Sequence, residues 1–297
     1  MTSLLPRVVL VTRETELQAL MARHATLGQA RFYLEQRGQR LEEVMVLHEA
    51  QTSAMTEARS AIPEDWTFAH VERANLDRFL FSRNDLVVAL GQDGLVANLA
   101  KYLSGQPVFG VTPNARAYES ILTIHEVAAL GPLLRRHAKG LSDISSRAMV
   151  EARVEEGDVL HALNEVFIGH RSHQSAKYML HFDGQQEFQS SSGVIFATGT
   201  GMTGWANSIT TATHNSISVS PTEAAGAFFV REPWPSKNTG TRLRAGLVTD
   251  SAHLRMSSRI NQGGVIFADG IEQDFLHFDW GTNVSLSVAS QRLNLVL

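Results

Sequence analysis

The sequence contains no cysteine, which excludes disulfide bonds, thiolate metal sites and thiol nucleophiles. The same absence fits a reducing compartment, so we expect a cytoplasmic protein. No apolar run approaches the ~20 residues that a membrane helix needs. The first residues also lack a charged start followed by a long apolar stretch, so we expect no signal peptide.

Charge is scarce as well, and neither sign dominates. Charged residues make up 19% of the 297 residues, and the formal net charge is −4. A chain of this kind does not attract nucleic acid or an anionic membrane through bulk electrostatics, so we expect neither partner. With 43% hydrophobic residues, the chain is long enough for two ordinary domains, each with its own core.

The first half alternates between the patterns of strands and helices. The continuous apolar run at 8–11 is typical of a buried parallel strand. This alternation predicts an α/β domain with a parallel sheet at 1–140. We expect strands at 7–12, 44–47, 66–71, 85–90 and 108–111, and helices at about 17–38, 49–62, 95–103 and 125–137.

After Gly140 the hydrophobic period falls to two, and short strands follow one another with turns between them. This pattern predicts an antiparallel all-β, sandwich-like domain at 141–297. A ligand would then lie in a cleft between the two halves, a common place for cofactors. We expect strands at 148–154, 166–169, 177–182, 227–231, 252–256, 264–268 and 284–288.

A glycine-bracketed acid follows the strand at 85–90, in the order Gly91, Gln92, Asp93, Gly94. Glycines let backbone amides approach a phosphate, and the start of the next helix adds the positive end of a dipole. Asp93 could then act as a general base or steer a magnesium ion. The alternative is an ordinary turn that leads into a helix N-cap.

A second glycine-rich loop occupies 198–205, after the apolar run 194–197. Its threonine hydroxyls and glycine amides offer many small donors, which suits a diphosphate or a ribose. Trp205 offers a flat face for a ring. A structural loop that ends in a helix cap is the alternative.

Five stretches, read in order, resemble the NAD kinases over roughly 85–297. They are Gly91-Gln92-Asp93-Gly94, the run 107–111, the segment Ala162-Leu163-Asn164-Glu165-Val166, the stretch from Ser192-Gly193 through Trp205, and the triplet Ala268-Asp269-Gly270. The resemblance implies ATP-dependent phosphorylation of the 2′-hydroxyl on the adenosine ribose of NAD, which gives NADP. Mg²⁺ would accompany ATP, in keeping with phosphoryl transfer by positioning and charge neutralisation. The resemblance to the NAD kinases also implies a homo-oligomer, such as a dimer.

The resemblance implies roles for particular residues. Asp93 would orient or deprotonate the hydroxyl, and Gly91 and Gly94 would shape the phosphate loop. Asn164 and Glu165 would bind the adenine and ribose region of the dinucleotide. The residues implied to close over it are Thr200, Thr203, Gly204 and Trp205.

Several residues depart from the family pattern. They include Gln92 in place of a glycine and Leu95 in place of a threonine, and also Thr112, Ser192, Gly199 and Met202. They suggest a divergent branch, somewhat like the mitochondrial-type members. A catalytically weak or inactive NAD(P)-binding sensor therefore stays an alternative, as does a lipid kinase that shares the glycine-aspartate-glycine element. Asp269 reads as a turn residue, although the resemblance allows it a role near the active site. We assign no metal ligands, since no histidine pair has the spacing of a helical zinc site.

Overall fold

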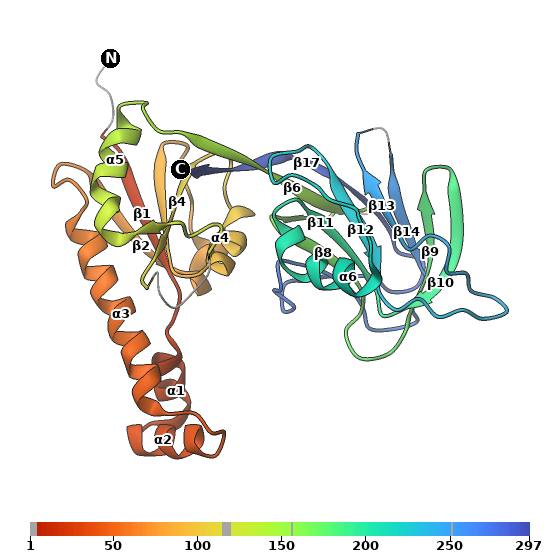
Figure 1. Cartoon of the computed structure of the whole chain (residues 1–297), viewed down its shortest axis with the longest axis horizontal. Coiled ribbons are helices and arrows are strands. Elements are labelled where there is room, and N and C mark those ends of the chain that lie inside the picture. The colour runs from red at the N-terminus through yellow and green to blue at the C-terminus, as the bar shows by residue number, and fades with distance from the viewer. Residues whose placement is uncertain (1–4, 115–119, 156, 251) are drawn as a thin grey trace. The chain divides into compact units, whose positions relative to one another are not determined.

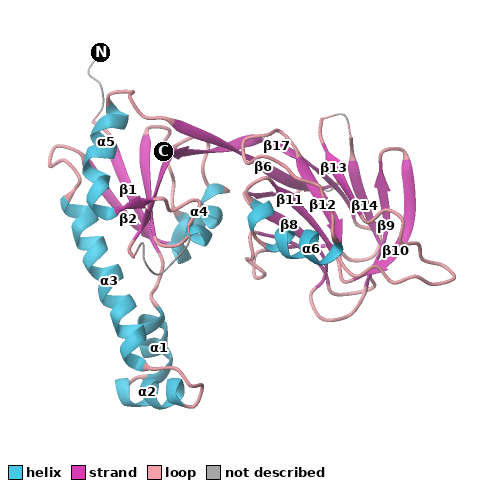
Figure 2. Ribbon diagram, in the orientation of Figure 1, coloured by secondary structure: helices cyan, strands magenta, loops and turns pink. Residues whose placement is uncertain are grey.

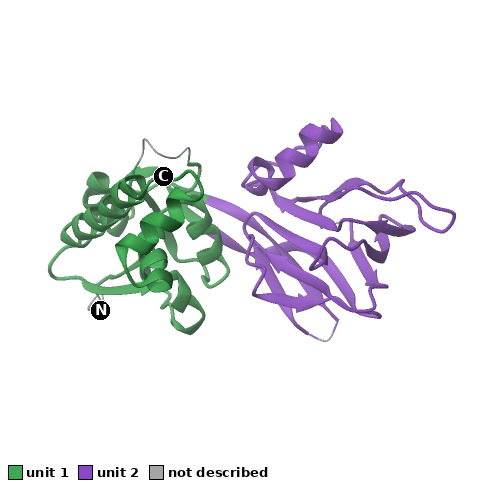
Figure 3. Ribbon diagram, turned by 90° about the horizontal axis from the view of Figure 1, so that it is seen from below, with its two compact units in different colours: residues 1–145, 294–297 green, residues 146–293 purple. Residues whose placement is uncertain are grey.

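The computed structural model describes residues 5–114, 120–155, 157–250 and 252–297. It divides into two compact units, which Figure 3 colours separately. The first unit comprises residues 1–145 and 294–297, and the second comprises 146–293. The prediction of an α/β part followed by an antiparallel β part is confirmed. The last residues of the chain, however, return to the first unit.

The first unit is built on a parallel sheet with the strand order β17-β4-β3-β1-β2 (Figure 1). The strands are β1 (Arg7–Thr12), β2 (Thr67–Glu72), β3 (Asp85–Leu90), β4 (Pro107–Thr112) and the end of β17 (Asn283–Val296). Every residue of β3 is buried, as expected for a strand covered on both faces. The short β5 (His125–Glu126) also pairs with β4.

Helices cover this sheet (Figure 2). One face carries α3 (Leu41–Ser60) and α5 (Leu130–Ala138), whose buried side chains join alternate residues of the strands in one core. The turns η1 (Arg73–Arg78) and η2 (Val127–Ala129) complete the connections. The helix α4 (Asp93–Ala100) follows β3 and contacts both β3 and β4. The loop before α4 therefore lies at the carboxyl end of a central strand.

The strand predicted at 44–47 is wrong, because these residues belong to α3. Leu41 and Val44 are one helical turn apart, and both are buried against α1 (Glu16–His24) and α2 (Leu27–Glu35). A run of four apolar residues is too short to show whether its hydrophobic period is that of a strand or of a helix. Here the contacts with α1 and α2 favour the helix. The single helix expected at 17–38 is also divided, since Ala25 adopts a left-handed φ of 56° between α1 and α2.

The second unit consists of two antiparallel sheets. One sheet has the order β13-β12-β11-β8-β15-β16. Its strands are β8 (Glu165–His170), β11 (Val194–Thr198), β12 (Gly226–Val230), β13 (Ala245–Val248), β15 (Gly264–Ala268) and β16 (Phe275–His277). The other sheet contains β6 (Ile144–Val154), β7 (Val159–Ala162), β9 (Ala176–Phe182), β10 (Gln185–Ser191), β14 (Leu254–Ser258) and β17.

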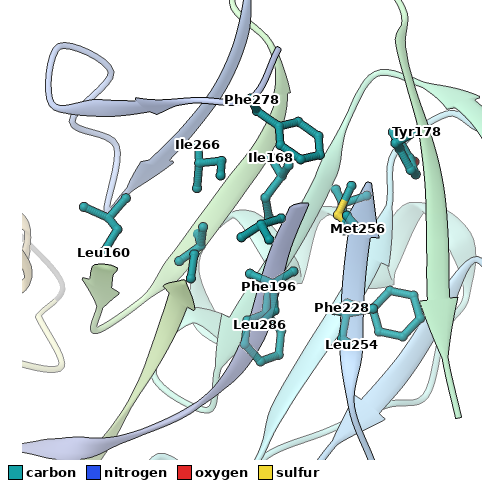
Figure 4. Close-up of a cluster of buried hydrophobic side chains, with 14 of the residues drawn as sticks. Leu160, Ile168, Tyr178, Phe196, Phe228, Leu254, Met256, Ile266, Phe278 and Leu286 are labelled. Carbon is teal, nitrogen blue, oxygen red and sulfur yellow. The ribbon is translucent and has the colours of Figure 1, made fainter. Parts of the chain in front are cut away.

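The two sheets pack face to face around one apolar core, as Figure 4 shows. Ile168, Phe196 and Phe228 come from one sheet, whereas Tyr178 and Leu286 come from the other. This alternation of inward-facing side chains is the sandwich that the period of two predicts. The opposite face of the six-stranded sheet is covered by η3 (Gly201–Thr203) and α6 (Trp205–Thr213). Among the described residues, no helix is both long enough and apolar enough to span a bilayer.

Candidate active site

Asp93 is the first residue of α4 and anchors a segment about 30 residues away in sequence. Its Oδ1 accepts hydrogen bonds from the amides of Leu122 and Thr123, at 3.1 and 2.8 Å, and from the Thr123 hydroxyl at 3.0 Å. Its Oδ2 accepts the amide of Ile121 at 2.8 Å. The carboxylate therefore holds this segment in place, and it is also the candidate catalytic group.

Gly110 on β4 lets the same segment approach the sheet. A Cβ at this position would lie 1.9 Å from the carbonyl oxygen of Leu122 and 3.0 Å from the Cα of Thr123. No side chain fits there without displacing the backbone. Gly110 permits the close approach, and Asp93 holds the segment once it is there.

The two glycines beside Asp93 differ in their surroundings. Gly91 is buried, and its amide donates to the carbonyl of Val111 at 2.9 Å. A Cβ on Gly91 would lie 3.1 Å from the Cδ2 of Leu95, which is itself only 2% exposed. Gly94 is exposed, with open space where its side chain would be. The side chain of Leu95 thus leaves little room for any residue larger than glycine at position 91.

A cavity of about 180 Å³ lies beside this loop, where β1, β3 and β4 end. Its wall includes Arg13, His48, Gly91 and Gln92. His48 is held in place, since its Nδ1 lies 2.8 Å from the hydroxyl of Thr15. Open α/β sheets bind ligands outside the carboxyl ends of their strands, so this cavity is where the fold favours a ligand. A neighbouring hollow of about 450 Å³ is lined in part by Thr112.

In the second unit, Asp269 organises the turn that carries Asn164 and Glu165. Its Oδ1 accepts their amides at 2.7 and 3.3 Å, and its Oδ2 accepts the amide of Leu163 at 3.0 Å. Asp269 itself adopts a left-handed φ of 50° at the end of β15. It is therefore more than a turn residue, because it determines the position of both predicted ligand-binding side chains.

The loop after β11 is fastened to this turn by Thr198, which is fully buried. Its hydroxyl donates to the carbonyl of Leu163 at 2.5 Å and accepts the amides of Thr200 and Gly201, both at 3.1 Å. Close packing requires Gly201, where a Cβ would lie 2.1 Å from the carbonyl oxygen of Asn164. The Asn164 turn and the glycine loop thus form one constellation.

Thr200 lies at the centre of this loop and is 1% exposed. Within the described part of the chain, its hydroxyl is buried and has no hydrogen-bond partner. Its carbonyl accepts the hydroxyl of Thr203 at 2.9 Å, and Gly204 then begins α6. A buried hydroxyl without a hydrogen-bond partner costs about 1–3 kcal/mol of stability. A ligand could form a hydrogen bond with this hydroxyl, but the loop would first have to shift, because the hydroxyl is buried.

The ring of Trp205 already has partners within the protein. It stacks on Phe167, with the centroids 5.7 Å apart and the planes 10° apart. The guanidinium of Arg231 lies over it at 4.9 Å. The flat face that the sequence suggested for a ligand ring is thus engaged by these two side chains. A binding role for Trp205 stays a prediction that requires one of them to move.

Glu165 is half-buried next to the carboxylate of Asp269. Loss of solvation, together with the negative charge of Asp269, raises the pKa of Glu165 to about 7. Near neutral pH this side chain can therefore either donate or accept a hydrogen bond. Such a group is well suited to a ribose hydroxyl, which can also do both.

Three comparisons with known proteins bear on this arrangement. No family model matches the chain. An NAD kinase from Caldanaerobacter subterraneus subsp. tengcongensis is 31% identical to it over 144 residues, which are 46% of this chain and 49% of that protein. The chain thus spans about half the length of the curated relative it matches. Over that part of its sequence, the chain is similar to an NAD kinase.

Solved structures show the same fold over nearly the whole chain. Yeast NADH kinase complexed with NADH matches with a TM-score of 0.62 and 16% identity, over 99% of this chain and 84% of that one. An NAD kinase from Archaeoglobus fulgidus in complex with ATP matches with a TM-score of 0.59 and 16% identity, over 98% and 93%. The predicted NAD kinase resemblance and fold are confirmed.

In the structure, the predicted residues fall into two groups. Gly91, Asp93 and Gly94 lie together in the first unit, by the end of β3. The others lie together in the second unit, namely Asn164, Glu165, Thr200, Thr203, Gly204 and Trp205. Asp269 belongs with the second group. Its signal in the sequence is an acid that precedes a glycine shortly after an apolar strand, which is also true of Asp93.

The residues that depart from the family pattern also have defined places in the structure. Gln92 and Ser192 are exposed, whereas Leu95 and Thr112 are buried. In the described ranges, no group of three or more histidine, aspartate or glutamate side chains is arranged to hold a metal ion. Mg²⁺ is commonly held by one or two carboxylates and the phosphates of its substrate, a mode that needs no such group.

Thr198 and Thr200 give a matched pair of variants for the loop. Thr198→Val should lower the free energy of unfolding by at least about 2 kcal/mol, because it leaves two amides and a carbonyl without their partner. Thr200→Val removes only an unpartnered hydroxyl, so it should leave that free energy unchanged or raise it by about 1 kcal/mol. Urea denaturation of both variants measures this. Equal losses would contradict the hydrogen bonding described for the loop.

Glu165→Gln tests the raised pKa of Glu165. Protonation of a carboxyl with a raised pKa favours the folded state, so wild-type stability should fall as the pH rises from about 4.5 and level off above about 7. Glutamine mimics the protonated form. Relative to wild type, the variant should therefore gain up to about 2–3 kcal/mol between pH 5 and pH 8.5 in urea denaturation. The same difference at both pH values would contradict the assigned shift.

Proposed function

We propose that this chain is an NAD kinase, which transfers the γ-phosphoryl group of ATP to the 2′-hydroxyl on the adenosine ribose of NAD and releases NADP and ADP. The observation that carries the proposal is the constellation in the second unit. There, Asp269 and Thr198 hold Asn164, Glu165 and a glycine-rich loop together. This gives amide, carboxyl and hydroxyl groups in the small space that a nucleotide requires.

The similarities support the same activity. The sequence relative is an NAD kinase, and the structures with the same fold were solved with NADH and with ATP. Both a dinucleotide and a triphosphate therefore suit proteins of this fold. NADH as well as NAD belongs among the acceptors to be assayed.

Asp93 would orient the acceptor hydroxyl. Its Oδ1 already accepts three hydrogen bonds, but its Oδ2 accepts one, from Ile121. A carboxylate oxygen has two lone pairs, so Oδ2 retains capacity for a substrate hydroxyl. The backbone amides fix the carboxylate in place, which is the positioning that phosphoryl transfer demands of a protein. Mg²⁺, bound mainly by the phosphates of ATP, would supply charge neutralisation.

One observation favours a second candidate, an NAD(P)-binding protein with little or no turnover. The Asp93 carboxylate is engaged by four donors, and the hydroxyl that the family pattern places next to Gly94 is replaced by the buried Leu95. Asp93 would then be purely structural. Binding of the dinucleotide through the second unit would survive without it.

One experiment separates the two candidates. Purified protein is titrated with NAD or NADH by calorimetry and then incubated with ATP and MgCl₂, and the formation of NADP or NADPH is followed by an enzyme-coupled assay. Binding together with turnover supports the kinase, and binding without turnover supports the second candidate. Turnover of diacylglycerol without any binding of NAD would reject both in favour of a lipid kinase.

Asp93→Asn tests the role of the carboxylate within an active enzyme. We expect kcat to fall by about 10²–10⁴-fold, because the charge that engages the hydroxyl is lost, while the Kd for NAD stays within about tenfold. Asparagine also loses one acceptor for the segment at 121–123, so stability must be controlled.

Thr123→Val is the matched control. It removes the hydroxyl bond to Asp93 Oδ1 but leaves the carboxylate intact. Its kcat should stay within a few-fold of wild type, with both proteins assayed well below their unfolding transitions. Similar losses of kcat in the two variants would mean that Asp93 acts only by holding the segment.

A further inference from the structure

A second hollow, of about 530 Å³, lies in the second unit away from the residues discussed so far. We call it the basic hollow, because Arg171, Lys177 and Arg259 line it together with polar residues and Trp280. None of the described residues that line it is acidic. In a chain with a net charge of −4, such a local excess of cations is unusual. It creates a positive potential suited to an anion.

The basic hollow lies at the end of the sandwich where chain segments cross between the two sheets. One crossing leads from β8 to β9, another from β14 to β15, and a third from β16 to β17. The first two are joined by backbone hydrogen bonds. The amide of Arg171 donates to Gly263 at 2.9 Å, and the amide of Arg259 donates to Lys177 at 2.8 Å. The three cations are therefore carried on segments that are fastened to one another.

His170 adds a further fastening between these segments. Its Nε2 lies 3.0 Å from the carbonyl of Gln262, so Nε2 is the donor, and its Nδ1 accepts the amide of Ser172 at 3.0 Å. Gly263 has a φ of +84°, and a Cβ there would lie 2.9 Å from His170 Nε2. His170 thus supports the walls of the basic hollow, whose cationic side chains are the two arginines and the lysine.

Trp280 gives the basic hollow an apolar surface. Its side chain is 62% exposed, and the guanidinium of Arg259 lies over the ring at 5.4 Å. Arg259 also donates to the carbonyl of Ser258 at 2.9 Å. The neighbouring Asp279 is directed elsewhere. Its Oδ1 accepts the amide of Gly264 at 2.9 Å, and its Oδ2 lies 3.9 Å from His277.

The basic hollow is separate from the constellation around Asn164. That constellation lies at the start of β8 and the end of β15, whereas the hollow lies at the end of β8 and the start of β15. At ~3.3 Å per residue along a strand, the two are roughly 20 Å apart. A ligand in the hollow would therefore not occupy the proposed dinucleotide site.

We propose that the basic hollow binds a di- or triphosphate group. Arg171, Lys177 and Arg259 provide three cations that converge on one open cavity, and guanidinium groups match phosphate oxygens with paired donors. A single phosphate would leave part of this charge unused. The group can be free polyphosphate or part of a nucleotide, whose base would lie against Trp280.

The first test is isothermal titration of the whole protein with sodium tripolyphosphate in low salt. An Arg171→Gln/Lys177→Gln double variant is compared with wild type, and its melting temperature is checked to show that it is folded. We expect the double variant to lose one tripolyphosphate site or to bind it at least about tenfold more weakly. Added KCl should weaken binding to the wild type, because exposed charges are screened.

Arg255→Gln/Lys237→Gln is the matched control. It removes one arginine and one lysine from exposed positions of the second unit that do not line the basic hollow. Its tripolyphosphate affinity should stay within about twofold of wild type. Equal isotherms for the two double variants would overturn the proposal, whatever the outcome of the NAD kinase assay.

Trp280→Ala distinguishes the two sources of the phosphate group. If the ligand is a nucleotide, the variant should bind ATP at this site more weakly while its tripolyphosphate affinity is unchanged, since stacking on a base is worth about 1–3 kcal/mol. If the ligand is free polyphosphate, both affinities should stay as in wild type. Both results support an anion site, and they differ only in its natural occupant.

Discussion

A carboxylate that accepts several backbone amides from a distant segment organises each half of this protein. Asp93 does this for residues 121–123, and Asp269 does it for residues 163–165. Irregular segments carry amides that no ladder satisfies, and an ionised carboxylate is the strongest acceptor the chain can offer them. Each acid lies within three residues of the end of a buried strand, so the sheet determines where its segment lies.

This arrangement couples structure to the proposed chemistry. In the second unit the coupling is electrostatic as well, because the charge of Asp269 helps to raise the pKa of Glu165 to about 7. In the first unit it limits what Asp93 can do, since only Oδ2 retains capacity for a further hydrogen bond. The contacts that hold the two loops in place therefore also influence the pKa of Glu165 and leave Asp93 one oxygen for a further hydrogen bond.

Much of the fold follows from local patterns, but the contacts that shape the loops do not. Buried runs such as 85–90 and the period-two strands after Gly140 predict the two kinds of sheet. The strand predicted at 44–47 was wrong, because these residues belong to a helix that packs against α1 and α2. Likewise, the sequence does not reveal that Gly110 and Gly201 each make room for a carbonyl oxygen from elsewhere in the chain. The unpartnered hydroxyl of Thr200 is equally invisible in sequence.

The pairing of β17 with β4 has a consequence for biosynthesis. Leu295 pairs with Val108, and His125 bonds to the carbonyl of Val296, so one strand of the first unit comes from residues that follow the second unit in the sequence. During translation, residues 146–293 must be made before this pairing can form, so the edge of β4 at Pro107 and Val108 stays unpaired until then. Such late, long-range closure favours slow maturation of the first unit and a need for protection of that edge by chaperones.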